Sequence, residues 1–436
     1  MIRPLILALC LVVLGNPVAA ATLGLTRIVD DTGVANPIHV AAPPGDSDRL
    51  FILDRSGVIR IYDRSSGTLL ATPFFDNSAV TATSGERGAY AIAFDRNFAT
   101  TGRLYLSYVD NRGAGGAETH RVISVDASAN PNVADAVSVR TVIDIPHTID
   151  GSGNHYGGWI GVDTANTLLI TTGDSGQQSD LENGSPLLGS ILRIDPNGDD
   201  FPTDAGRNYA IPGDNVSPGG GPVTEVIAEG FRNPYRGGYD DATGTLLVGD
   251  VGQNRLEEVN IVEQGLNYGW PDFEGTLPFS TFFPPGTLFE DPAFEYVHGA
   301  EPIAGSSITG GEVYRGPLGA LDGLYFFGDF ISDRILSLEF DAASGTLSDL
   351  TRWDLDIDAG DITGLASFGQ DGDGNLYVID LFGDVFLVSS AEDVDRNVAV
   401  PLPASGLLLL GGLAALGAAR YRRKAPTSST WADQRN

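Results

Sequence analysis

The residues of this chain best suited to acid–base chemistry are His155 and Asp174. An imidazole titrates near neutral pH, so His155 can accept a proton from a hydroxyl group at physiological pH. Asp174 ends a later apolar run, and its carboxylate can orient the ring and stabilise its protonated form. The alternative is a hydrogen-bonded structural histidine without a chemical role. His298 is a weaker second candidate base.

Arg232 and Asn233 form a second candidate pair, directly after the run Ile227–Phe231. A guanidinium in this place can stabilise negative charge that develops on a reacting group. The alternative is a structural arginine that pairs with a carboxylate such as Glu229 or Asp240.

The elements that must position these residues repeat along the chain. A short apolar run, typical of a β-strand, ends in Asp six times: Leu50–Asp54, Leu104–Asp110, Leu168–Asp174, Leu246–Asp250, Leu324–Asp329 and Leu376–Asp380. Glycine-containing turns precede most copies, and a second strand follows most of them. Irregular spacing around a regular element indicates a β-repeat with variable loops. The chain is therefore predicted to be all-β, a six-bladed β-propeller rather than a sandwich of hairpins.

Composition and missing motifs exclude several function classes. The formal net charge of −31 disfavours nucleic acid and anionic lipid as partners, whereas a neutral sugar is compatible with it. No Gly-x-Gly-x-x-Gly lies between a strand and a helix, so a Rossmann dinucleotide site is not expected. Asp371–Asn375 resembles the start of an EF-hand loop but is better explained as a hairpin turn.

Taken in order, the motifs resemble those of the glucose/sorbosone dehydrogenase family, the soluble quinoprotein sugar dehydrogenases. The matching segments are His155–Gly158, Gly173–Gly176, Glu229–Pro234, Gly249–Glu258 and Asn267–Pro271. The resemblance covers roughly residues 40–390. It implies oxidation of an aldose at its anomeric carbon to a lactone, with hydride passing to pyrroloquinoline quinone (PQQ) and then to an external electron acceptor. His155 would be the base, Asp174 its orienting partner, and Arg232 with Asn233 would face the quinone.

The same resemblance implies further cofactor and metal contacts. Glu86 takes the position of a polar cofactor contact. The main-chain carbonyls of Gly252 and Gln253 would reach a cofactor-bound calcium ion, and Glu258 with the Tyr268 carbonyl would hold a second, structural one. Calcium binds six to eight oxygens, which carbonyls and carboxylates on a rigid turn supply. The alternatives are a solvated acidic hairpin and a Glu86 that pairs with Arg87.

Family members also place a lysine after the fifth strand copy and an Arg-x-Arg before the sixth. This chain has Phe330–Arg334 and Ala359–Thr363 in those regions. Arg315, Arg334 or a calcium ion would then balance the three carboxylates of PQQ. The aromatic motif Asn267–Pro271 is expected to pack between blades. Two alternative functions stay open: a non-catalytic propeller that binds glycans or proteins, and a calcium-dependent lactonase.

The two ends of the chain differ from its body. Residues 1–20 are predicted to be a secretory signal peptide, and they contain the single cysteine, Cys10. Residues 21–396 would form the propeller. Residues 397–424 combine an apolar run with a basic cluster and resemble a VPLPA/PEP-CTERM-type C-terminal sorting tail of Gram-negative bacteria, or a plain transmembrane anchor helix. Residues 425–436 are a tail. The body is therefore expected to be secreted, periplasmic or on the cell surface.

Overall fold

The computed structural model describes residues 21–111, 118–147, 153–176, 186–280, 288–299 and 303–392. All of them fall within one compact unit, Ala19–Asp395. The predicted signal peptide and C-terminal tail lie outside the described residues. Within the described ranges, no helix combines the length and apolar character needed to cross a membrane.

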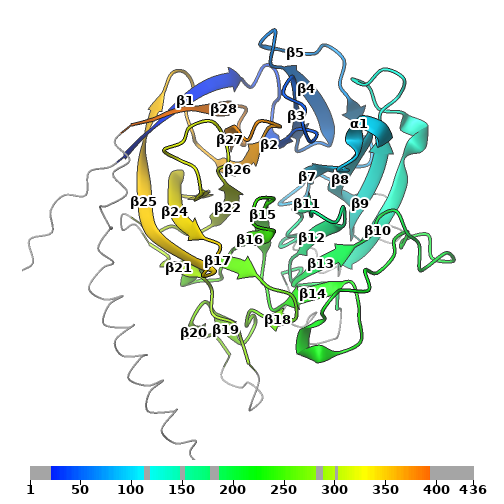
Figure 1. Cartoon of the computed structure of the whole chain (residues 1–436), viewed down its shortest axis with the longest axis vertical. Helices are drawn as coiled ribbons and strands as arrows, with labels where there is room; N and C mark the ends of the chain where they lie inside the picture. The colour runs from blue at the N-terminus through cyan, green and yellow to red at the C-terminus, as the bar shows by residue number, and fades with distance from the viewer. Residues whose placement is uncertain are drawn as a thin grey trace, which may run out of the picture. The chain divides into compact units, whose positions relative to one another are not determined.

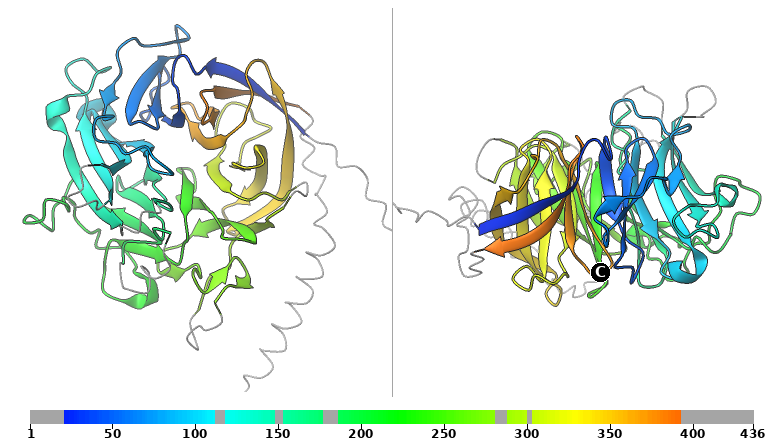
Figure 2. Two further views of the ribbon diagram at one scale, coloured as in Figure 1. Left: turned by 180° about the vertical axis from the view of Figure 1, so that it is seen from behind. Right: turned by 90° about the horizontal axis from the view of Figure 1, so that it is seen from above.

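The described strands form sheets arranged in a ring around a central axis (Figure 1), and Figure 2 shows this ring from behind and edge-on. The first sheet contains β2 (Pro37–Ala41), β3 (Arg49–Asp54), β4 (Val58–Asp63), β5 (Thr68–Leu69) and β6 (Phe75–Asp76). The next contains β7 (Ala89–Phe94), β8 (Arg103–Asp110), β9 (Glu118–Asp126) and β10 (Arg140–His147). The third contains β11 (Ile160–Val162), β12 (Leu168–Thr172), β13 (Ser190–Ile194), β14 (Val226–Glu229) and β18 (Leu266–Asn267).

The second half of the chain continues the ring. One sheet contains β15 (Pro234–Asp240), β16 (Thr245–Asp250), β17 (Leu256–Val262) and β21 (Phe294–Val297), and a small hairpin contains β19 (Phe273–Glu274) and β20 (Leu277–Pro278). The last sheet contains β22 (Ile308–Val313), β23 (Leu324–Asp329), β24 (Arg334–Asp341), β25 (Thr346–Ile357), β1 (Ala21–Val29), β28 (Val385–Glu392), β27 (Leu376–Asp380) and β26 (Leu365–Gln370). Helical turns are limited to α1 (Phe98–Thr101), η2 (Ala136–Ser138) and η3 (Pro218–Gly220) in the described part.

The all-β propeller class is confirmed, and each predicted strand copy forms the second strand of its group: β3, β8, β12, β16, β23 and β27. The number of separate sheets differs from the prediction. Among the described residues, sheets of four or more strands number five rather than six. The reason is that β25 pairs in parallel with β1, with Ala21 opposite Trp353, and this pairing joins two antiparallel groups into one eight-stranded sheet.

The inner strands are largely buried because each sheet packs between two neighbours. All residues of the inner strand β7 and of the second strand β12 are buried, which explains why both are rich in apolar residues. In contrast, β25 on the outside is exposed or half-buried except at Leu350 and Trp353. The first strands contact one another in the order β2, β7, β11, β15, β22 and β26, and β26 contacts β2 again. The walls of a central channel are therefore made by these strands.

The aspartates that end the strand copies have a shared structural task. Asp250 accepts hydrogen bonds from the backbone amides of Arg232 and Asn233, which lead into the first strand of the same sheet. Asp329 binds the amides of Ser306 and Ser307, and Asp380 binds those of Thr363 and Gly364. In these three copies a buried carboxylate thus holds the loop that enters the inner strand, which satisfies backbone donors that would otherwise be buried without partners.

Leu23→Ala is expected to lower the free energy of unfolding by about 2–5 kcal/mol. Leu23 is fully buried on β1, where it pairs with Leu355 on one side and Ala391 on the other. The substitution leaves a cavity in the sheet that closes the ring. Urea denaturation measures the effect. Val137→Ala, at a 90% exposed side chain, is the control and should change stability by less than about 0.5 kcal/mol. If Leu23→Ala lost no more unfolding free energy than Val137→Ala, the packing of β1 would not contribute to the stability of the ring.

Glu312 on β22 gives a pH-dependent prediction. Burial, with the nearby charges of Asp240 and Asp241, raises the pKa of Glu312 from 4.5 to about 8. The folded chain therefore holds a proton that the unfolded chain releases, so stability falls as pH rises between these values. Urea denaturation measures the free energy of unfolding at pH 5 and at pH 8. The decrease between these two pH values should be smaller for Glu312→Gln than for the wild type, because glutamine stays neutral. The exposed Glu392→Gln should keep the wild-type difference; an unchanged difference in Glu312→Gln would refute the assignment.

Candidate active site

His155 lies between Asp174 and Arg232. Its Nδ1 is 2.6 Å from Asp174 Oδ1, and its Nε2 is 3.1 Å from Arg232 Nη2. A carboxylate only accepts hydrogen bonds, so Nδ1 carries the proton and Nε2 keeps its lone pair. His155 also has a positive φ of 52°, a conformation that costs a non-glycine residue energy and is frequent at functional sites. Three predicted residues, far apart in the sequence, therefore converge.

Asp174 is fixed from several sides. Its side chain is buried, Oδ1 also accepts the Gly176 amide at 2.8 Å, and Oδ2 accepts the Trp270 indole N–H at 2.9 Å. Trp270, in the motif expected to pack between blades, is buried and also fixes the carboxylate of Asp174. A buried indole N–H requires an acceptor, and that requirement was the available sequence signal.

Among the described residues, the Arg232 guanidinium has hydrogen-bond partners that carry no negative charge. Nε donates to Gln253 Oε1 at 2.9 Å, and Nη1 donates to the carbonyls of Val251 and Gly252 at 2.8 and 2.7 Å. These bonds place the side chain against the loop that follows β16. Its Nη2 edge is directed at His155.

The alternative pairing of Arg232 with Glu229 or Asp240 is wrong. Glu229 accepts a hydrogen bond from Asn267, and Asp240 forms an ion pair with Arg315. The guanidinium of Arg232 therefore keeps a net positive charge within the site.

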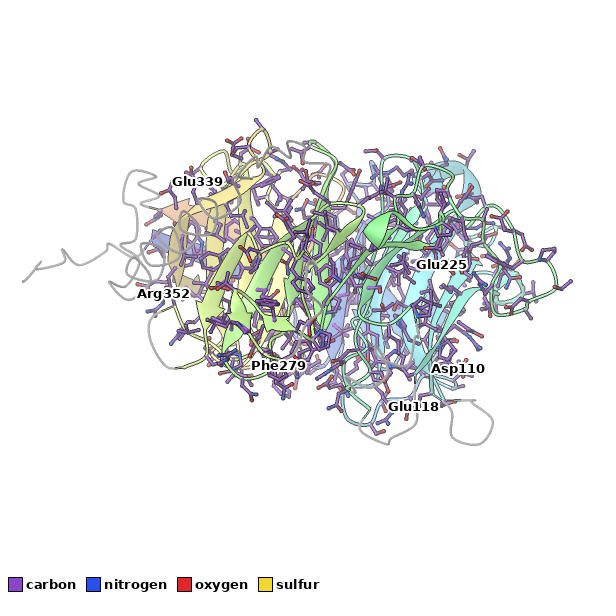
Figure 3. The ribbon with its side chains drawn as sticks, turned by 90° about the horizontal axis from the view of Figure 1, so that it is seen from below. Asp110, Glu118, Glu225, Phe279, Glu339 and Arg352 are labelled. Atoms are coloured by element: carbon purple, nitrogen blue, oxygen red, sulfur yellow. The ribbon has the colours of Figure 1, made fainter. Side chains whose placement is uncertain are left out.

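Asn233 and Glu86 fix the loop that carries His155. Asn233 Oδ1 accepts the Gly157 amide at 3.0 Å, and Glu86 Oε2 accepts the His155 amide at 3.0 Å. The proposed pairing of Arg87 with Glu86 is wrong, because Arg87 forms an ion pair with Glu118. Figure 3 shows Glu118, Asp110 and Phe279 on one face of the disc, and Phe279 packs on Trp270 with ring centroids 4.9 Å apart.

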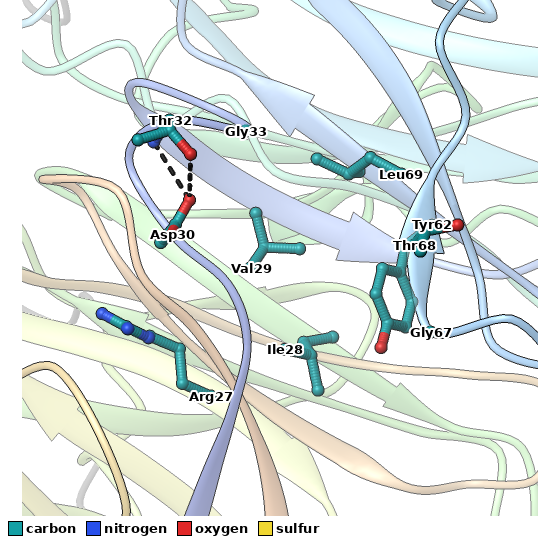
Figure 4. A pocket seen from close by; sticks show the side chains of 10 residues that line it. All are labelled: Arg27, Ile28, Val29, Asp30, Thr32, Gly33, Tyr62, Gly67, Thr68 and Leu69. Carbon is teal, nitrogen blue, oxygen red and sulfur yellow. Dashed lines mark hydrogen bonds between the residues drawn. The ribbon is translucent and has the colours of Figure 1, made fainter.

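A pocket of about 440 Å³ opens beside His155, a size usual for small-molecule sites. Its lining includes Arg55, Glu86, Tyr90, His155, Asn233, Arg232, Tyr235, Gly252, Gln253 and Phe330. Another hollow lies between β1 and β5, lined by Arg27, Asp30 and Tyr62 among others (Figure 4), and contains none of the predicted site residues.

His298, the weaker candidate base, is placed elsewhere. Its Nε2 is 2.5 Å from Glu257 Oε1, and this bond raises its pKa. It does not line the pocket beside His155. Glu257 in turn accepts the amides of Gly252 and Ile308, so this pair holds the loop after β16.

Glu258 lies in a buried polar group rather than in a solvated acidic hairpin, so that alternative is wrong. Asp250 faces Glu258 across the β16–β17 ladder, and Asn260 Nδ2 donates to Glu258 Oε2 at 3.1 Å. Burial raises the pKa of Asp250 to about 7, and burial with the Asp250 charge raises the pKa of Glu258 well above its usual value. Asn260 Oδ1 is buried without a hydrogen-bond partner. A cation among these oxygens would balance the charge of the two buried carboxylates and give the Asn260 oxygen a partner.

Tyr268 contributes packing to this region. Its ring stacks on Phe231 with centroids 4.7 Å apart, and its hydroxyl donates to the Ile261 carbonyl at 2.7 Å. The Gly252 carbonyl accepts from Arg232. Within the described ranges, no group of three or more His, Cys, Asp or Glu side chains is arranged to hold a metal ion.

Comparison with known proteins identifies relatives of several kinds. HIPL2 protein of Arabidopsis thaliana is 27% identical over 381 residues, which are 74% of this chain and 55% of the relative. Aldose sugar dehydrogenase YliI of Escherichia coli (strain K12) is 29% identical over 269 residues, 61% of this chain and 66% of the relative. Hedgehog-interacting protein of Mus musculus is 26% identical over 321 residues, 68% of this chain and 41% of the relative. The chain spans about half the length of the HIPL relatives that it matches.

The fold is shared with solved structures. The PQQ-bound form of Aldose Sugar Dehydrogenase from Streptomyces coelicolor superposes with a TM-score of 0.62 at 20% identity, covering 86% of this chain and 100% of that chain. Residues 34–380 match the sequence profile described as Glucose / Sorbosone dehydrogenase. Since this match covers most of the chain, the protein belongs to the glucose/sorbosone dehydrogenase family.

Proposed function

We propose that this chain is a PQQ-dependent dehydrogenase that oxidises an aldose at its anomeric carbon to a lactone and passes electrons to an external acceptor. The observation that carries this proposal is His155 held between Asp174 and Arg232 at the wall of a pocket. Relatives that include an aldose sugar dehydrogenase support the reaction class. The sugar itself stays open.

The residues have distinct tasks in this proposal. Asp174 holds the proton on His155 Nδ1, so Nε2 is the atom that takes the proton of the sugar hydroxyl. Arg232 Nη2 donates to that atom, and the sugar hydroxyl must replace this bond. The released guanidinium edge then faces the pocket, where it stabilises negative charge. When bound, PQQ accepts the hydride.

The pocket suits an anionic, flat cofactor. Arg55 and Arg232 line it, and the carboxylate among its lining residues, Glu86, is engaged by the His155 amide. Tyr90 and Tyr235 offer flat aromatic walls. The residues that would hold PQQ are therefore Glu86, Asn233, Gln253 and the two arginines.

We also propose a calcium ion at Asp250, Glu258 and Asn260. Three buried side chains with oxygen donors, two of them carboxylates with raised pKa values and one with an unpartnered oxygen, fit this hard cation. A second ion near the carbonyls of Gly252 and Gln253 would require bound cofactor, because Arg232 now takes the Gly252 carbonyl.

Three broader proposals accompany the activity. Six blades are supported by the closed order of contacts among the first strands and by the parallel β25–β1 pair that joins two four-stranded groups. Export is supported by the sequence of residues 1–20, and attachment to a membrane by that of residues 397–424.

Kinship with a Hedgehog-interacting protein favours a second candidate, a non-catalytic propeller that binds a protein. A calcium-dependent lactonase is not favoured. It needs a metal on the channel axis, whereas the Arg236 guanidinium crosses the channel from β15 to Ser367 of β26 and the Ile38 carbonyl of β2.

Asp174→Asn is expected to lower dye-linked aldose oxidation, assayed with added PQQ and calcium, by about 10²–10⁴-fold. The amide can present its N–H to Nδ1 and so shift the proton to Nε2, which removes the base. His155→Gln should lose at least as much activity, and both variants should retain PQQ binding. Asp54→Asn, at the matching place of the first strand copy, controls for damage to the fold. Full activity in Asp174→Asn would refute the base, and a wild type without quinone-dependent activity would favour the protein-binding alternative.

Calcium is expected to raise the thermal unfolding temperature of the wild type over that measured in chelator, by several degrees. Glu258→Gln should reduce this response strongly, because it removes one of two facing carboxylates, and Asn260→Leu should reduce it in part. The exposed Glu392→Gln is the control and should respond as the wild type does. An equal response in Glu258→Gln would place any bound calcium elsewhere.

A further inference from the structure

Arginines around the pocket differ from most others in this acidic chain. Eleven arginines of the described residues form ion pairs with carboxylates: Arg27, Arg49, Arg64, Arg87, Arg96, Arg103, Arg121, Arg193, Arg207, Arg255 and Arg315. Arg55, Arg232 and Arg236 have no carboxylate partner among the described residues, although the formal net charge is −31. Arginines elsewhere, such as Arg140, also have only neutral partners in the described structure, but Arg55, Arg232 and Arg236 lie together in or behind the wall of one pocket.

Arg55 directly lines the pocket. Its Nε donates to the Arg87 carbonyl at 3.0 Å, and its Nη2 donates to the carbonyls of Thr83 and Gly85. These bonds hold the loop that carries Glu86. They use neutral acceptors and leave the charge of the guanidinium unbalanced, with Nη1 free of protein acceptors in the described structure.

Arg236 lies behind the pocket wall and is 1% exposed. Its Nε donates to Ser367 Oγ at 3.0 Å, and its Nη2 donates to the Ile38 carbonyl at 2.9 Å. The guanidinium carbon lies 4.3 Å from the centroid of the Tyr235 ring. Both Ile38 and Tyr235 line the pocket, so these residues separate the Arg236 guanidinium from a ligand bound there. A buried charge without a counter-ion costs several kcal/mol, a cost that an anion in the pocket would reduce.

The two arginines expected to balance the cofactor are not suited to it. Arg315 forms ion pairs with Asp240 and Asp322, so its charge is already compensated. Arg334 donates to the Ala304 carbonyl, and neither arginine lines the pocket.

We propose that Arg55 and Arg236 together supply the positive charge that holds the acidic groups of the pocket's ligand, and that Tyr235 is the surface on which its flat ring lies. Arg55 binds a carboxylate through its free edge. Arg236 acts through Tyr235, as a positioning residue that makes the pocket floor attractive to anions. The pocket then selects a planar ring system with several carboxylates. This inference rests on the proposed function and assigns its charge recognition to residues of this chain.

The test measures binding of PQQ to the full chain by isothermal titration calorimetry, with no sugar or dye present. Arg55→Gln and Arg236→Met are each expected to weaken binding by about 10- to 100-fold, because each removes one charged partner. Both should also flatten the dependence of affinity on salt. Arg236→Lys, which keeps the charge, should recover part of the affinity. Arg352→Gln on the outer strand β25 is the matched control and should bind as the wild type does (Figure 3).

A second probe, pyridine-2,6-dicarboxylate, separates this inference from the proposed function. If the wild type binds PQQ and both charge-removing variants bind it equally well, the inference is wrong and the function stands. If the wild type binds the dicarboxylate but not PQQ, and Arg55→Gln loses that binding, the anion site is right and the cofactor is wrong. If the wild type binds neither, both are wrong. Thermal unfolding of Arg236→Met checks its folding, and Arg55→Gln decides the outcome where that variant is unstable.

Discussion

A buried aspartate at the end of the second strand of a sheet is the interaction on which this architecture depends. Asp250, Asp329 and Asp380 each accept two backbone amides from the loop that enters the neighbouring inner strand. Asp174 occupies the matching place in its sheet but binds the His155 ring and the Trp270 indole instead. The aspartate that orients the candidate base therefore takes a position that recurs in other sheets, where the same residue type has a structural role and binds backbone amides.

Close backbone packing makes this exchange of partners feasible. A Cβ atom at Gly173 would overlap the carbonyl of His155, and one at Gly157 would press on the carbonyl of Thr171. The absence of side chains lets the loop of His155 lie directly on the end of β12, with a left-handed backbone at His155 itself. The glycines beside the histidine thus decide how near the ring comes to Asp174.

The sequence was informative where signals are local. A strand ending in Asp is a short pattern, and its six copies predicted the strands that the structure contains. Trp270 was missed because its partner Asp174 follows a strand of an earlier part of the chain, and local periodicity reports burial but no partner. Asn260 lies two residues after Glu258 on β17, so alternation puts both on one face, but whether its oxygen has a partner depends on the fold. Arg315 was misjudged for the same reason: whether an arginine is compensated depends on which acids the fold brings to it, here Asp240.

The contrast between a strongly acidic chain and an arginine-rich pocket follows from the range of electrostatic forces. At physiological ionic strength, exposed charges are screened beyond about 8 Å, so the net charge of −31 governs encounters with large partners and contributes little inside the pocket. Buried charges are screened much less, so Arg236, which has no carboxylate partner in the described part of the chain, can act on a ligand in the pocket. The chain can therefore repel polyanions as a whole and still hold a small polycarboxylate. The two properties are set by different residues, and each can change without the other.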